Sequence, residues 1–117
     1  MNTERYNLRK RLGSGEVLFG PWCVIPSADV ANIIATAGFD FMIIDMEHGS
    51  VNIETALNMT RAIQAEGCSP LLRFGTIEEN DILHALDMGA EGIIAAHVES
   101  PEDAKELVRL ARYHPIG

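Results

Sequence analysis

The chain has 117 residues, and its 47% hydrophobic and 22% charged content predicts a single soluble globular domain over residues 1–117. Its 17 acidic against 9 basic side chains give a net charge of −8, which argues against nucleic acid or an anionic membrane as the main partner. No apolar run approaches the roughly 20 residues of a membrane helix, and the first ten residues are too polar for a secretory signal.

Helix and strand signals alternate along the first part of the chain. Residues 2–12 predict a short polar helix that stops at Gly13, and residues 17–25 predict a strand that Pro21 interrupts. Ser27 is the expected cap of the next helix, whose apolar positions are Val30, Ile33, Ile34 and Ala37.

A buried strand is predicted over residues 41–45 because four apolar side chains follow one another there. Asn52 is then the expected cap of a helix that ends before Gly67, and residues 70–74 predict a third strand. One face of that helix is predicted to carry Ile53, Ala56, Leu57 and Ile63.

The last part of the chain repeats the alternation. Residues 76–79 have the pattern of a capping box, and the helix that follows is expected to stop at Gly89. A fourth strand is predicted over residues 92–96, and residues 100–103 combine the cap, first-turn proline and acid of a helix start. The expected buried face of this last helix consists of Leu107, Val108 and Ala111.

Strand, helix and strand in series predict βαβ units and a parallel α/β sheet. Four such units with a short N-terminal helix correspond to half of a (β/α)8 barrel of the TIM type. A small doubly wound, flavodoxin-like sheet is the alternative fold. It is weakened because no glycine-rich phosphate loop follows the first strand.

Chemistry-bearing side chains follow the second strand, where α/β proteins usually place an active site. Asp45 is three residues before His48, a spacing at which the carboxylate can orient the imidazole as a general base. The competing interpretation is an exposed histidine, with Asp45 accepting a hydrogen bond from a backbone amide. Glu47 is either a supporting acid or a solvated loop carboxylate.

Arg73 ends the third strand, where a guanidinium suits bidentate binding of a carboxylate, unless it only pairs with a neighbouring acid. Trp22 ends the first strand and is expected either to pack in the core or to wall a pocket. Asp87 is at a helix end, where a carboxylate opposes the helix dipole and therefore suggests a specific partner. No residues have the spacing of a zinc site.

Two further histidines, His97 after the fourth strand and His84 on a helix, differ in their expected roles. His97 and Glu99 are placed at the same sheet edge as Asp45, whereas His84 is expected to be exposed. Cys23 and Cys68 are not closely spaced, which predicts a reduced, cytoplasmic compartment.

Taken together, the motifs resemble the HpcH/HpaI aldolases, which are metal-dependent aldolases of 2-oxo acids. The most specific element is Asp45-Met-Glu-His-Gly49, and four other segments match in order and spacing. These segments are Phe19-Gly-Pro-Trp22, Pro70-Leu-Leu-Arg73, Leu86-Asp-Met-Gly-Ala90 and Arg112-Tyr-His-Pro-Ile-Gly117.

The resemblance implies a role for each site residue. His48 would be the catalytic base with Asp45 as its partner, and Arg73 would bind a pyruvate-type 2-oxo acid beside Trp22. Asp87 and Glu47 would support the site. A divalent ion (Mg, Mn or Co) would stabilise the enolate, with no ligand from this chain.

The family's metal ligands come from later strands than the four seen here. We therefore expect weak or no aldolase activity from this polypeptide alone. The alternative function is a non-catalytic barrel half that acts as a binding or assembly module. In both cases a homo-oligomer is expected, because a second copy would cover the open sheet edges.

Overall fold

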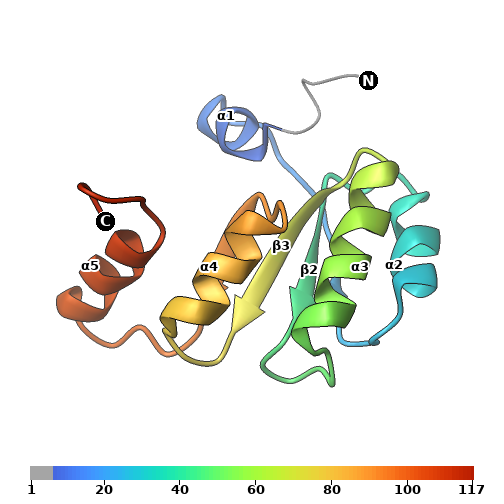
Figure 1. Ribbon diagram of the computed structural model, residues 1–117. Coiled ribbons are helices and arrows are strands. Elements are labelled where there is room, and N and C mark those ends of the chain that lie inside the picture. The colour runs from blue at the N-terminus through green and yellow to red at the C-terminus, as the bar shows by residue number, and fades with distance from the viewer. Residues whose placement is uncertain (1–6) are drawn as a thin grey trace.

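The computed structural model describes residues 7–117 and contains one parallel four-stranded sheet in the order β1-β2-β3-β4. The strands are β1 (Trp22–Cys23), β2 (Phe41–Asp45), β3 (Ser69–Phe74) and β4 (Gly92–Ala95). The helices are α1 (Leu8–Gly13), α2 (Ala28–Ala35), α3 (Ile53–Ala65), α4 (Glu79–Asp87) and α5 (Pro101–Leu110). Helices α2, α3 and α4 lie along one face of the sheet (Figure 1).

The alternating α/β order is confirmed, and the strand order rejects the flavodoxin-like alternative. A doubly wound sheet places non-consecutive strands side by side, whereas here every strand pairs with its neighbours in sequence. None of the helices described is long and apolar enough to cross a membrane.

Short local signals explain most of the helix starts. The side chains of Ser27 and Asn52 accept hydrogen bonds from backbone amides three residues later, and Ser100 forms a capping box with Asp103. A glycine with positive φ follows each of the helices α2, α3 and α4 and turns the chain toward the next strand. These glycines are Gly38, Gly67 and Gly89. They confirm the helix ends that were predicted before Gly67 and at Gly89.

Two predicted boundaries are wrong. The capping box at residues 76–79 does not form, because α4 begins only at Glu79 and Glu78 makes no side-chain cap. The strand predicted over residues 17–25 is reduced to Trp22–Cys23, since only these two residues pair with β2. The helix predicted over residues 2–12 is seen from Leu8, and residues 2–6 lie outside the described part.

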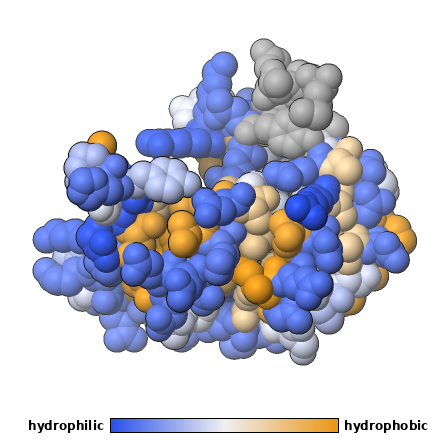
Figure 2. All heavy atoms as spheres, viewed as in Figure 1, coloured by the Kyte–Doolittle hydropathy of each residue, from blue (hydrophilic) through white to orange (hydrophobic). Residues whose placement is uncertain are grey.

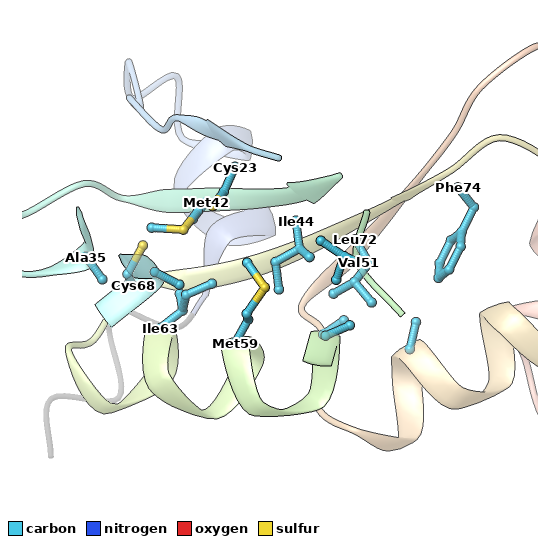
Figure 3. Close-up of a cluster of buried hydrophobic side chains, with 14 residues drawn as sticks. Cys23, Ala35, Met42, Ile44, Val51, Met59, Ile63, Cys68, Leu72 and Phe74 are labelled. Atoms are coloured by element: carbon cyan, nitrogen blue, oxygen red, sulfur yellow. The ribbon is translucent and has the colours of Figure 1, made fainter. Parts of the chain in front are cut away.

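The hydrophobic core fills the space between the sheet and its helices (Figure 3). Met42 and Ile44 of β2 and Leu72 of β3 are fully buried there against Met59 and Ile63 of α3. Because side chains alternate along a strand, Ile43, Leu71 and Arg73 point to the other face of the sheet. That face is the one on which the polar cluster is built.

Helix burial differs from prediction on α2 and α5. On α2 the buried residues are Ala31 and Ala35, and Ile33 is exposed, because small side chains allow α2 to pack closely on α3. Helix α5 has no buried residue, so its predicted buried face is wrong. Apolar side chains are exposed at the surface between α4 and α5 (Figure 2). Leu83, Leu86 and Leu110 line a cavity of 270 Å³ there.

Candidate active site

A polar cluster lies at the carboxyl-terminal edge of the sheet. Asp45 is the last residue of β2, Arg73 is next to last in β3, and the two are in register. Glu47 and His48 follow β2 in a tight turn, and His97 follows β4. The parallel sheet therefore brings together residues up to 50 positions apart in sequence.

The centre of the cluster is an ion pair between Asp45 and Arg73. Nε of Arg73 donates to Oδ1 of Asp45 at 3.1 Å, and Nη2 donates to Oδ2 at 2.9 Å. Oδ1 also accepts hydrogen bonds from the backbone N–H groups of Glu47 and His48, at 3.0 and 3.2 Å. Both carboxylate oxygens are therefore occupied by donors.

These contacts set the charges of the pair. Burial favours a higher pKa for Asp45, but hydrogen bonds from Arg73 and from the two backbone amides outweigh it and hold the pKa below its usual range. Hydrogen bonding to Asp45 raises the pKa of Arg73. Arg73 therefore remains a cation, and Asp45 remains an anion, throughout the physiological range.

Trp22 flanks the guanidinium from β1, the edge strand on the other side of β2. The Arg73 Cζ atom lies 4.4 Å from the centroid of the Trp22 ring, a cation–π contact. The indole is 51% exposed, so core packing is the wrong interpretation of this residue. Trp22 instead forms a wall over Arg73, as the alternative prediction stated.

Glu47 is the second acid of the cluster, and the sequence predicted it either as a supporting acid or as a solvated loop carboxylate. Its side chain is only 13% exposed, so it is not a solvated loop carboxylate. Oε1 lies 2.9 Å from Nε2 of His97 and 3.8 Å from Nε2 of His48, and Oε2 lies 3.4 Å from Nε of Arg73. Its position two residues after a strand-end aspartate was the available signal.

The predicted pairing of Asp45 with the His48 imidazole is wrong. Asp45 accepts from the backbone N–H of His48 because the tight turn after β2 folds that amide back over the carboxylate. The His48 ring is 71% exposed, and its nearest carboxylate oxygen belongs to Glu47. Glu47, and not Asp45, is therefore the carboxylate nearest to this imidazole.

Asp87 does not join the cluster within this chain. It ends α4, which runs back from the carboxyl-terminal to the amino-terminal edge of the sheet (Figure 1). Its carboxylate accepts a hydrogen bond from the Tyr113 hydroxyl at 2.9 Å, and this bond raises the pKa of Tyr113. The predicted supporting role of Asp87 is therefore replaced by a contact with the C-terminal segment.

A divalent ion does not fit the residues that the structure describes. Nowhere in residues 7–117 do three or more His, Cys, Asp or Glu side chains come together in a way that could hold a metal. Asp45 is also a poor ligand here, because its two oxygens already accept four hydrogen bonds. His84 and Glu99 are exposed, as expected for His84, and neither contacts the cluster.

Comparison with known proteins agrees with this architecture. The family model for HpcH/HpaI aldolase/citrate lyase matches residues 18–117. The chain belongs to this family. It is 38% identical to a hydroxypyruvate/pyruvate aldolase of Roseobacter denitrificans, over 93% of this chain and 43% of that protein. It is 33% identical to a 4-hydroxy-2-oxovalerate aldolase of Novosphingobium aromaticivorans, over 100% of this chain and 45% of that protein.

The HpcH/HpaI fold is also found in solved structures. The crystal structure of the citrate synthase SbnG matches with a TM-score of 0.87 and 39% identity, over 94% of this chain and 45% of that one. The chain thus spans less than half the length of the relatives it matches. Its four βα units correspond to about half of a TIM barrel, which confirms the predicted fold.

Proposed function

We propose that these residues form part of a pyruvate-type aldolase site that cleaves 4-hydroxy-2-oxo acids to pyruvate and an aldehyde. The observation that carries this proposal is the fixed cation at the strand edge. Arg73 is held by Asp45 on one side and flanked by Trp22 on another, yet Nη1 makes no hydrogen bond to any described residue. Nη1 can therefore bind a carboxylate or enolate oxygen.

In this proposal His48 moves the proton. Its exposed Nε2 would take the proton of the substrate's 4-hydroxyl group as the bond between C3 and C4 breaks. The aldehyde leaves, and the proton that Nε2 took then returns to C3 of the pyruvate enolate, which restores the neutral imidazole and gives pyruvate. Arg73 supports this step because its positive charge stabilises the negative charge of the oxo acid and of the enolate.

No step of this mechanism uses a divalent ion. The family resemblance implies Mg, Mn or Co in the complete reaction, as a Lewis acid for the oxo group. Since the described residues do not form its site, we assign no step to it. We expect the 117-residue chain to bind pyruvate and to release little or none from a 4-hydroxy-2-oxo acid.

Pyruvate binding gives the direct test of Arg73. The chain has one tryptophan, and it lies against Arg73, so its fluorescence reports on the site. We expect pyruvate to change Trp22 fluorescence saturably. Arg73→Lys should raise the dissociation constant about tenfold or more, because lysine has no counterpart of Nη1 and cannot keep the two-point contact with Asp45 that orients the guanidinium. The fluorescence titration measures both.

Arg109→Lys is the matched control. Arg109 lies on α5, where it pairs with Glu106 on the surface, and this variant should bind pyruvate like the wild type. Circular dichroism checks that both variants are folded. Equal pyruvate affinity in wild type and Arg73→Lys would contradict the proposed role. Divalent-dependent pyruvate release by the chain would contradict the expected lack of turnover.

An assembly role is the second proposal, and it is favoured by the surface around β1. Both outer strands, β1 and β4, have an unpaired edge within the described sheet. Next to the β1 edge, five large apolar residues each expose about half or more of their surface. They are Val17, Phe19, Trp22, Val24 and Ile25. Exposed apolar side chains along an open strand edge are characteristic of a surface that associates.

We expect the chain to form a homodimer in which the β1 edge of one copy meets the β4 edge of the other. Light scattering coupled to size exclusion should give about twice the 12.8 kDa of one chain. Phe19→Lys should yield monomers, whereas Ile33→Lys, at a site on α2 of nearly equal exposure (67% and 68%), should not. A stable, folded wild-type monomer would contradict this expectation.

A further inference from the structure

Glu47 links three groups of the cluster, and its environment is specific. Its Oε2 atom is buried without a hydrogen bond, at 3.4 Å from the Arg73 Nε atom. The backbone just after β3 packs closely against this side chain, since a Cβ atom at Gly75 would come within 3.0 Å of Glu47 Cγ. The carboxylate is therefore held in a small space between β3 and the loop after β4.

The loop after β4 reaches Glu47 through His97. Nε2 of His97 lies 2.9 Å from Oε1 of Glu47, and an ionised carboxylate can only accept, so Nε2 carries the hydrogen. His97 has a φ of 58°, whereas every other described residue with positive φ is a glycine. Such an unfavourable backbone conformation at the edge of a site is often retained for function.

His97 and His48 face the same carboxylate oxygen at different distances. His97 is within hydrogen-bond distance, whereas Nε2 of His48 is 3.8 Å away and makes no hydrogen bond to it. His97 therefore occupies Oε1. Nε2 of His48 is therefore not hydrogen-bonded to Glu47, although the Glu47 carboxylate is only 3.8 Å away.

We propose that His97 is a positioning residue, which holds Glu47 so that Oε2 faces Arg73 and Nε2 of His48 stays free for substrate. The proposal rests on the proposed oxo acid site, because Arg73 is the group that would bind the ligand. His97 acts on that ligand only through Glu47. Without the imidazole, Glu47 can turn toward His48, and Arg73 loses the second of its two acidic neighbours.

Three variants test this role. His97→Asn keeps a residue that tolerates positive φ but removes the imidazole, and His97→Gln restores an N–H donor on a longer side chain. His84→Asn is the matched control, because this histidine of α4 is exposed and its ring makes no hydrogen bond to any described residue. Two readouts are measured: the pyruvate dissociation constant from Trp22 fluorescence, and the NMR signal of the Arg73 Nε–H group in the ligand-free protein.

We expect His97→Asn to raise the pyruvate dissociation constant about 3- to 10-fold, the factor that one lost hydrogen bond represents. The Arg73 Nε–H signal should shift and exchange faster with water. His97→Gln should recover most of both effects, and His84→Asn should show neither.

An unchanged Arg73 Nε–H signal in His97→Asn would overturn the positioning role, whatever the affinity does. If wild-type protein binds no pyruvate, the proposed function fails. The positioning role is then decided by the Arg73 signal alone, because that signal needs no ligand.

Discussion

Replacing Asp45 by alanine should lower the free energy of unfolding by about 3 kcal/mol, because it breaks a buried ion pair and removes the acceptor of two backbone N–H groups. Arg73 would keep its charge without its main partner. Pyruvate binding should weaken as well, since the guanidinium loses the hydrogen bonds that orient it. Urea unfolding followed by circular dichroism measures the first effect, and Trp22 fluorescence measures the second.

Asp45→Asn separates charge from hydrogen bonding, because the amide oxygen still accepts from the backbone. The pKa of Asp45 is lowered by folding, so its ionic contribution is complete above the unfolded value of about 4 and is lost as the pH falls through the folded value. The stability difference between wild type and Asp45→Asn should therefore be largest near neutral pH and shrink below about pH 4. A difference that grows in acid would contradict this account.

Replacing Leu72 by alanine should cost about 2–5 kcal/mol of unfolding free energy, the usual range for a leucine removed from a closely packed core. Leu72 is fully buried on the helix-covered face of β3, next to Ile44 in the core cluster. Neighbouring strands and α3 surround it, so the cavity cannot collapse easily. The midpoint and slope of urea unfolding give the loss.

Leu71→Ala is the matched control for that experiment. Leu71 is adjacent in sequence and of the same type, but it points to the opposite face of the sheet and is only partly buried. We expect it to cost about 1 kcal/mol, in proportion to the smaller area it removes from water. Equal losses for the two leucines would mean that both faces of the sheet are packed to the same extent.

Much of the fold was predictable because its signals are local. The apolar run at residues 41–45 gives β2 its observed limits, and Ser27, Asn52 and Ser100 are the caps that were expected. The errors arise where tertiary contacts decide. The strand predicted at residues 17–25 pairs with β2 over only two residues, and the face that α2 buries depends on how closely α3 approaches.

The site was predictable by position but not by pairing. Strand ends placed Asp45, His48 and Arg73 at one edge, and the structure brings them together there. Spacing in sequence could not show that Asp45 pairs with Arg73 of the next strand, because that contact depends on the register between β2 and β3. For the same reason the contact between Glu47 and His97, 50 residues apart, has no signature in a single sequence.

The pairing of Asp45 with Arg73 also constrains how β2 and β3 can align. A shift of one residue between parallel strands would turn every side chain of β3 to the opposite face. The guanidinium of Arg73 would then enter the apolar layer under α3, while Leu72 and Phe74 would face away from it. The observed alignment of β2 and β3 therefore pairs Arg73 with Asp45 and also keeps charged side chains out of the hydrophobic core. The residues that we propose to bind the oxo acid thus help to select the register of the sheet.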